Sequence, residues 1–180
     1  MKRVIAVTGT PGTGKTTISK KLAKALKNCE LINANDIVKE KRLFSSYAED
    51  GAMVVKMTRL NQEINRRVRS SRADFVIVDG HLLCEMKIDG AVAIVIREHL
   101  HTLLKRLKQR KYGRKKIEDN IVSEGIDYCG IRAANYYKKV YELEGGKVAL
   151  SSAIKIAKGE TVSLPDVELL GELNGLLGKL

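Results

Sequence analysis

A short apolar run near the amino end is followed at once by a glycine-rich loop and then by a helical pattern. The run is Val4–Val7, and the loop reads Gly9-Thr10-Pro11-Gly12-Thr13-Gly14-Lys15-Thr16, which matches the pattern G-x-x-x-x-G-K-[ST]. Glycines let such a loop fold with several backbone N–H groups pointing inward, and the helix that opens near Lys15 adds its positive end. This order predicts a nucleoside triphosphate site, with Lys15 at the β- and γ-phosphates and Thr16 on Mg²⁺.

Apolar runs continue to alternate with helical patterns as far as residue 111. The strand-like runs are Val4–Val7, Leu31–Asn33, Phe75–Asp79 and Val92–Ile96, and the helical patterns are Lys15–Lys27, Ala34–Arg42, Thr58–Ser71 and His99–Lys111. Uninterrupted β-branched runs are typical of strands that are covered on both faces, as in a parallel sheet. We therefore expect one α/β domain over residues 1–180, a P-loop NTPase fold with three α/β/α layers and its ligand at the carboxyl ends of the strands.

Two inserts and a less regular tail complete the chain. The inserts are residues 33–59, which we expect to bind a monophosphate acceptor, and about 110–119, which we expect to form a small basic lid. Beyond Lys115 the pattern is helical to about Glu144, with interruptions near Gly125 and Gly130. Ala149–Ile156 fits a strand or a helix, and Asp166–Leu177 is expected to be a final helix because Pro165 precedes it.

The chain is strongly basic. It has 33 Lys and Arg against 21 Asp and Glu, a formal charge of +12, which favours polyanionic partners such as nucleotides and RNA. A solvated lysine-rich surface explains many of these residues equally well. The three cysteines form no C-x-x-C pair, which is typical of a reducing interior. With no apolar run of membrane-spanning length and no leader pattern, we expect a cytoplasmic protein without a membrane partner.

Asp79 follows a buried strand directly, in the segment VIVDGH, and His81 comes two residues later. A carboxylate at this edge of a parallel sheet faces the phosphate loop, where it can hold Mg²⁺ through water. The simpler alternative is a strand-end cap, since Asp favours turns. His81 would order a water or contact the Mg²⁺ shell, or be an ordinary loop histidine.

The segment from Lys105 to Lys116 holds eight basic residues and no acidic one. A turn at Tyr112-Gly113 interrupts its helical pattern and presents Arg110 beside a short loop. Arginines on a mobile lid neutralise the charge that spreads over a transferring phosphoryl group, while the lid excludes water. Arg110 is therefore a candidate catalytic and ATP-binding residue. The alternative is a charged, solvated helix face.

An acceptor for the phosphoryl group needs its own pocket opposite the triphosphate. Polar residues in the 33–59 insert are candidates for it, namely Asn33 and Asp36, with Arg59 as a weaker candidate for the acceptor phosphate. Asn35 or Asp36 capping the following helix explains the same residues equally well.

Three motifs occur together: the loop GTPGTGKTT, the strand VIVDGH, and the pattern R-x-Y-x-x-K-K-I-x-x-N-I-x-x-E from Arg110 to Glu124. Over residues 4–124 the chain resembles the archaeal adenylate kinase-like family, whose eukaryotic relatives are the sixth adenylate kinase isoenzyme, or coilin-interacting nuclear ATPase. The resemblance implies a broad-specificity nucleoside monophosphate kinase that also hydrolyses ATP. It further implies a part in small-subunit ribosome and pre-rRNA maturation, with a ribosomal protein and pre-ribosomal RNA as partners.

Carried over by position, the resemblance implies specific roles for residues of this chain. ATP contacts are implied for Gly12, Gly14, Lys15, Thr16, Thr17 and Arg110. Asp79 and His81 match the D-x-H pair of the family, so that Lys15, Arg110, Asp79 and His81 are the expected catalytic residues and Thr16 and Asp79 the expected metal ligands. Asn33 and Asp36 lie in the segment that corresponds to the monophosphate site.

Two interpretations of the ATP chemistry stay open. The first is transfer of the terminal phosphoryl group to AMP or a related monophosphate with Mg²⁺. The second is an ATPase assembly factor with weak kinase activity, whose hydrolysis drives release from a pre-ribosome. A signalling GTPase is disfavoured because the chain has no N-K-x-D motif and position 82 is Leu where D-x-x-G needs glycine. A shikimate-type kinase is disfavoured because paired glycines after the strand ending at Asp79 are missing.

Overall fold

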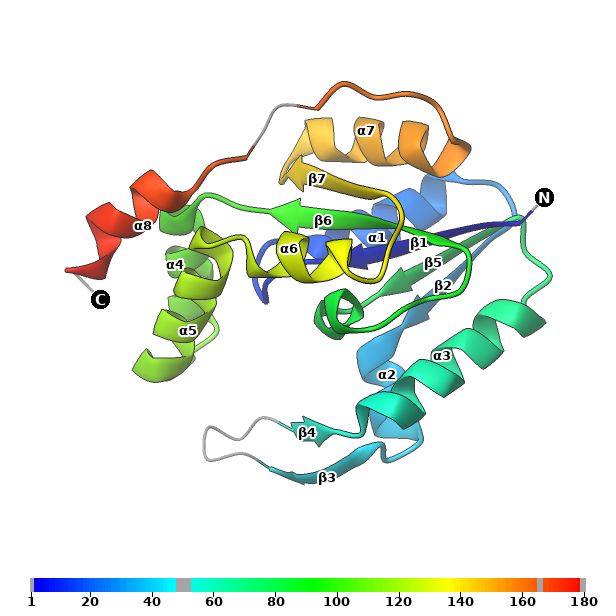
Figure 1. The fold of residues 1–180 in the computed structure, drawn as a ribbon, viewed down its shortest axis with the longest axis horizontal. Coiled ribbons are helices and arrows are strands. Elements are labelled where there is room, and N and C mark those ends of the chain that lie inside the picture. Colours follow the sequence, from blue (N-terminus) through cyan, green and yellow to red (C-terminus); the bar gives the residue numbers. More distant parts are fainter. Residues whose placement is uncertain (1, 48–52, 165–166, 179–180) are drawn as a thin grey trace.

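Five parallel strands form the central sheet of the protein, in the order β2-β5-β1-β6-β7 (Figure 1). The computed structural model describes residues 2–47, 53–164 and 167–178. The strands are β1 (Arg3–Thr8), β2 (Cys29–Asn33), β5 (Phe75–Asp79), β6 (Ala91–Arg97) and β7 (Val140–Glu144). Because β1 lies between β5 and β6, the sheet winds outward in both directions from β1, and the carboxyl ends of these three strands meet at one edge.

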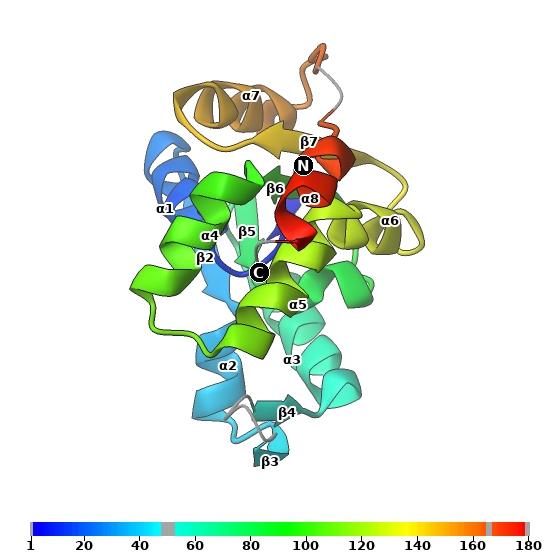
Figure 2. The same cartoon turned by 90° about the vertical axis from the view of Figure 1, so that its left-hand side faces the viewer.

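Helices cover both faces of this sheet, as the uninterrupted apolar strands require (Figures 1 and 2). One face packs against α1 (Lys15–Ala25) and α7 (Lys147–Lys158). The other packs against α2 (Ala34–Glu40), α3 (Met57–Ser70), the 3₁₀ helix η1 (His81–Glu85) and α6 (Tyr128–Ala134). Two separate apolar cores result, and the predicted three-layer P-loop fold is confirmed.

The two inserts project from the carboxyl edge of the sheet (Figure 1). The first contains α2, α3 and an antiparallel hairpin of β3 (Phe44–Tyr47) and β4 (Met53–Val55) that the sequence patterns did not predict. The second, about residues 110–119, comprises the turn between α4 (Leu100–Gln109) and α5 (Arg114–Gly125) and the first part of α5; below, the lid means α4, this turn and α5 together. The short helix α8 (Leu170–Leu177) packs across α4 and α5, in a third apolar cluster that holds Leu103, Ile121 and Leu173.

The expected long helix up to Glu144 is wrong. Helical structure ends at Ala134, and residues 140–144 form β7, which pairs in parallel with β6 from Ala93 to Arg97. The strand satisfies the backbone groups along the free edge of β6, a tertiary gain that outweighs local helical preference.

The tail agrees with one of its two alternatives. Ala149–Ile156 lies within α7 and is helical. The expected final helix begins at Leu170, and the Pro165-Asp166 start predicted for it lies outside the described residues. No helix in the described ranges is long and apolar enough to cross a bilayer.

Candidate nucleotide-binding site

The loop after β1 takes a conformation that only glycine tolerates. Gly9, Gly12 and Gly14 have φ angles of +137°, +105° and +95°. A Cβ atom on Gly9 would lie 2.4 Å from the carbonyl oxygen of Ile96 in β6, so the loop passes directly over the neighbouring strand. The glycines of the motif are therefore needed for backbone geometry, as the sequence pattern predicts.

Lys15 stands at the start of α1 and is almost fully buried, with 9% of its surface exposed. Its Nζ donates a hydrogen bond to the carbonyl oxygen of Thr10, 3.3 Å away, which folds the side chain back over the loop. Burial lowers the pKa of Lys15, and the Asp79 carboxylate works against that shift. An incoming phosphate would supply the negative partner that this ammonium group lacks.

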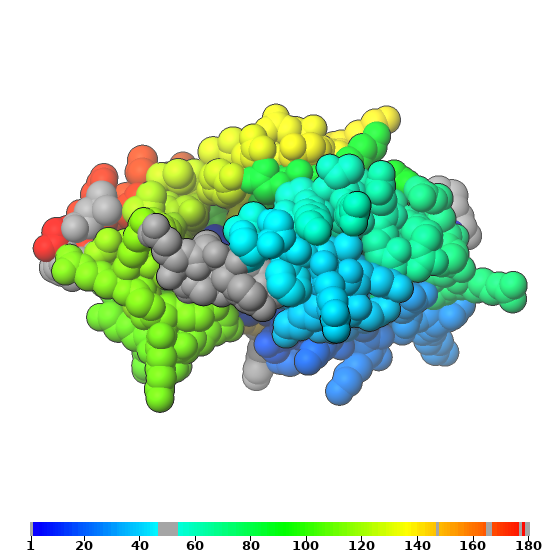
Figure 3. All heavy atoms as spheres, turned by 90° about the horizontal axis from the view of Figure 1, so that it is seen from below, coloured from blue at the N-terminus to red at the C-terminus, as the bar shows by residue number. Residues whose placement is uncertain are grey.

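The loop forms one wall of a cavity of about 770 Å³ at the carboxyl edge of the sheet. Seen from below, the segment of α4 and α5 and the segment of α2 to β4 are neighbouring parts of one face (Figure 3). The cavity is lined by eight residues for which the sequence predicted a role: Gly12, Gly14, Lys15, Thr16, Thr17, Asp79, His81 and Arg110. The structure thus brings the predicted ATP-binding and catalytic residues together.

Asp79 ends β5 with a side chain that is buried on the cavity wall. Its Oδ2 accepts a hydrogen bond of 2.9 Å from Asn33 Nδ2, whereas its Oδ1 is buried without a hydrogen-bond partner. Burial raises the pKa of Asp79, while Thr16 and Lys15 favour the charged form. A free carboxylate oxygen beside a threonine hydroxyl fits a hard divalent cation such as Mg²⁺, which takes few protein ligands and several from phosphate and water.

The described residues contain no cluster of three or more His, Cys, Asp or Glu side chains that could hold a metal ion by themselves. Asp79 and Thr16 would therefore hold Mg²⁺ only together with oxygens from a bound nucleotide.

His81 opens η1 and lines the cavity. Burial lowers its pKa to about 4, and the positive charges of Lys15 and Lys116 add to this effect. The imidazole is therefore neutral near pH 7 and can exchange hydrogen bonds with a water or a hydroxyl.

The lid contributes more residues than Arg110. Arg110 is exposed at the end of α4, and Tyr112, Lys116 and Asn120 line the cavity with it. Lys116 and Asn120 are spaced i, i+4 and so lie on one face of α5, and Lys116 Nζ stands 5.0 Å from the ring centre of Tyr112. From the sequence, Tyr112 was expected only in the turn and Lys116 only among the basic residues around it, while Asn120 drew no expectation. Their spacing in the lid pattern was a usable signal.

The acceptor side differs from the prediction in detail. Asn33, Asp36 and Arg59 are not among the residues that line the cavity, and the last two are exposed. Asn33 instead caps α2, because its Oδ1 accepts hydrogen bonds from the backbone N–H groups of Asn35 and Asp36. The wall on this side is formed by Asn35, Val38, Val55 and Met57.

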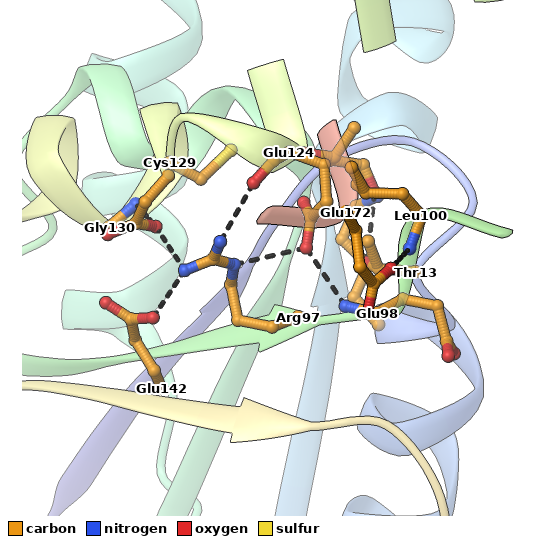
Figure 4. A network of polar contacts seen from close by, with 12 residues as sticks. Thr13, Arg97, Glu98, Leu100, Glu124, Cys129, Gly130, Glu142 and Glu172 are labelled. Carbon is orange, nitrogen blue, oxygen red and sulfur yellow. Dashed lines mark hydrogen bonds and ion pairs between the residues drawn. The ribbon is translucent and has the colours of Figure 1, made fainter. Parts of the chain in front are cut away.

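A buried arginine joins the lid to the sheet (Figure 4). Arg97, at the end of β6, is 1% exposed and pairs with Glu124 Oε1 at the end of α5, 3.1 Å from Nε. Its Nη1 pairs with Asp127 and Glu142 at 2.6 and 2.5 Å, and its Nη2 donates to the Glu124 carbonyl oxygen. The Glu98 backbone N–H also donates to Glu124. One guanidinium thus fixes α5, the start of α6, and β7 at a common point.

The same part of the chain is tied to the phosphate loop through α4. Arg106 Nη1 forms an ion pair of 2.6 Å with Glu98 and donates a 3.2 Å hydrogen bond to the carbonyl oxygen of Gly12.

Comparison with known proteins agrees with this geometry. Residues 5–127 match a family model described as "AAA domain". Curated proteins named "Putative adenylate kinase" are similar to the chain: that of Pyrococcus furiosus is 36% identical over 78% of this chain and 74% of its own length. That of Methanosarcina barkeri is 31% identical over 78% and 75%. The chain belongs to the archaeal adenylate kinase-like family.

A solved structure supports the fold assignment of this family member. Shikimate kinase from Bacteroides thetaiotaomicron superimposes with a TM-score of 0.57, covering 87% of this chain and 96% of its own. At 16% identity this similarity concerns the fold alone.

Proposed function

We propose that the protein transfers the terminal phosphoryl group of ATP to a nucleoside monophosphate, with AMP as the first candidate. One observation carries the proposal. Among the residues that the structure describes, two buried side-chain oxygens lack a hydrogen-bond partner, Thr10 Oγ1 and Asp79 Oδ1, and both residues line the same cavity. Buried polar atoms without partners are rare, and a polar ligand in the cavity would satisfy both.

The residues around this cavity suit phosphoryl transfer. This reaction depends on positioning and on neutralising charge, and requires little covalent chemistry from the protein. Lys15 and Arg110 would stabilise the negative charge of the transferring group, and the lid would keep water out. Thr16 and Asp79 would hold Mg²⁺ together with the bound ATP, and the ion would supply positive charge that neutralises the phosphates. His81, being neutral, would orient the attacking phosphate oxygen of the monophosphate, or a water, without adding charge.

The acceptor would bind against the α2–β4 side. Val38, Val55 and Met57 offer an apolar surface for a flat base, and Asn35 offers an amide for its polar edge. The predicted acceptor roles of Asn33, Asp36 and Arg59 stay proposals. An Arg59→Ala variant tests the role of Arg59: an increased KM for the monophosphate with an unchanged KM for ATP would support it.

Product analysis tests the proposal directly. The purified chain is incubated with Mg²⁺ and ATP, together with AMP, CMP or dAMP in turn, and with water as the only acceptor in the control. With CMP or dAMP, formation of the matching nucleoside diphosphate in equal amount to ADP supports a kinase; with AMP, the supporting result is two ADP formed for each ATP consumed. Release of inorganic phosphate alone, at the same rate with every acceptor, would refute it.

The lid arginine has a matched control in the same turn. Arg110→Ala should reduce phosphoryl transfer strongly, whereas Lys111→Ala should not, because Lys111 is equally exposed but does not line the cavity. Equal activities of the two variants would remove Arg110 from the mechanism.

ATP hydrolysis and a role in small-subunit maturation form the second proposal. It is supported by the +12 charge and by five exposed basic residues of the lid region, Lys105, Lys108, Lys111, Arg114 and Lys115. These side chains can contact RNA phosphates, and such binding weakens steeply with salt. Co-sedimentation with immature small subunits at low salt, lost when these five basic residues are replaced, would support the proposal. No association at low salt would refute it.

A further inference from the structure

Two buried thiols face each other on the wall of the cavity. Cys84 belongs to η1 and Cys129 to α6, 45 residues later, and their Sγ atoms are 3.8 Å apart. The two side chains are 2% and 7% exposed, and both residues line the cavity. The pair is therefore shielded from bulk solvent but open to a small solute that enters the site.

Polar contacts on either side hold the two elements together. Tyr137 donates its hydroxyl to the carbonyl oxygen of Leu83, 2.8 Å away. Arg132 of α6 pairs with Glu85 of η1 at 2.5 Å, and the Tyr128 hydroxyl also bonds to Glu85. These contacts flank Cys84 in η1 and Cys129 in α6. The fold therefore holds the two thiols opposite each other.

The chemistry of the pair is asymmetric. The hydrogen bond with Cys129 lowers the pKa of the Cys84 thiol. The same contact, together with burial, raises the pKa of the Cys129 thiol. The thiolate is the reactive form of cysteine, so Cys84 is the attacking sulfur and Cys129 the resolving one. A disulfide needs an S–S separation of about 2.05 Å, so the two sulfurs, 3.8 Å apart, must move closer for the bond to form.

We propose that Cys84 and Cys129 form a redox modification site, which hydrogen peroxide converts into an intramolecular disulfide. The Cys84 thiolate attacks one peroxide oxygen, the O–O bond breaks, and Cys84 becomes a sulfenic acid as water leaves. Cys129 sulfur then attacks the Cys84 sulfur, the S–O bond breaks, and a second water leaves with the thiol proton. Two thiols lose two electrons and two protons, and one peroxide becomes two waters.

The third cysteine cannot join this reaction within one molecule. Cys29 packs against the core on the α1 and α7 side of the sheet, whereas Cys84 and Cys129 belong to the core on the opposite side. Cys29 is also more exposed than either partner of the pair. It therefore serves as an internal control for simple thiol reactivity.

The consequence for the site is a covalent link between two elements that line the cavity, η1 and α6. The bond would join η1, directly after Asp79, to α6, which follows the Arg97 and Glu124 junction. This inference depends on the apposed thiols only and holds whichever reaction the cavity supports.

Peroxide titration of the full, reduced chain tests the proposal. We expect the intact mass to fall by two hydrogens, the three free thiols to fall to one, and peptide mapping to find Cys84 linked to Cys129. Dithiothreitol should restore all three thiols. Peptide mapping of the unmodified chain needs no variant, so it keeps the test valid even where a substitution disturbs folding.

Variants provide the matched controls. Cys29→Ser should still lose two hydrogens, whereas Cys84→Ser and Cys129→Ser should gain oxygen or stay unchanged. The proposal is overturned if peroxide leaves the pair reduced while Cys29 reacts. It is equally overturned if only oxygen adducts form at Cys84 and Cys129, or if the mass loss persists in Cys84→Ser.

Discussion

The phosphate loop and the lid face each other across one cavity but are built in different ways. The loop is local: it comprises consecutive residues between β1 and α1, and its shape depends on glycines with positive φ. The lid is fixed by residues from distant parts of the chain, since Arg97 meets Glu124 after 27 residues and Glu142 after 45. The phosphate loop is therefore shaped by backbone conformation, whereas the lid is held in place by buried charges.

This difference predicts different responses to substitution. When Lys15 of the phosphate loop is replaced, catalytic activity should fall with little change in the free energy of unfolding. The lid wall should lose stability when Arg97 of β6, which holds it to the sheet, is replaced, because the charges around Arg97 are buried.

The largest expected effect is that of Arg97→Ala on stability. The variant leaves Glu124 buried without its cation, a kind of loss that costs about 3–5 kcal/mol of unfolding free energy. Urea denaturation measures it. Arg114→Ala is the control, because the Arg114–Glu118 pair is exposed and contributes about 0.5 kcal/mol or less. If both variants lose the same small amount, the lid is not held by buried charge.

Next comes Lys15→Ala, which acts on turnover. Loss of a charge-stabilising group at a transferring phosphoryl should lower kcat about 10²- to 10³-fold. The unfolding free energy should stay close to that of the native chain, in contrast to Arg97→Ala. Lys24→Ala on the exposed side of α1 is the control and should keep full activity. A Lys15→Ala protein that turns over normally would contradict the proposed role of the loop wall.

A smaller effect is expected at Asn33, where the first insert joins the sheet. Asn33→Ala removes the cap of α2, worth about 1 kcal/mol, together with the hydrogen bond to Asp79. Asn33→Ser should restore the cap but not the amide donor. Stability measurements and Mg²⁺ titrations of both variants separate the roles. Identical behaviour of the alanine and serine variants in both measurements would argue against two functions for Asn33.

The smallest effect is a pH dependence on the outer side of the lid. His99 lies between Glu172 of α8 and Glu144 of β7, at 2.5 and 2.9 Å, and the hydrogen bond to Glu172 raises its pKa. A raised pKa in the folded state means that this stabilisation is complete below about pH 6.5. It is lost as the pH rises through the folded-state value.

Protection factors from hydrogen exchange in α8 should therefore decrease modestly between about pH 6 and pH 9. His99→Gln, which carries no titrating charge, should show a flat profile. A decrease of the same size in His99→Gln would assign the pH dependence to another group.

The two walls also differ in how far they could be predicted from the sequence. The loop, the strands β1, β5 and β6, and the placement of Lys15, Thr16 and Asp79 at one cavity follow from short patterns whose geometry is local. The β7 strand was missed because its stability comes from pairing with β6. The β3–β4 hairpin was missed because nothing in its short segments is periodic enough.

Contacts between distant residues explain the remaining differences. Asn33 was expected at the acceptor, a role that stays a prediction, and its position opposite Asp79 in the β2–β5 register adds the roles of cap and donor. Arg97 and Glu124 drew no prediction as a pair, because only the packing of α5 against the end of β6 brings them together. The predicted domain extent and cytoplasmic location stay predictions.

The closeness of α8 to α5 matters for handling the protein. A Cβ atom on Gly125 would lie 2.8 Å from Leu173, so α8 packs directly against α5. The helix thereby covers the apolar inner surface of the lid, which includes Leu103 and Ile121. A truncated chain ending at Leu164 would expose that apolar surface to solvent and would be prone to aggregation. Expression clones should keep this segment, and purification tags are better attached at the opposite terminus.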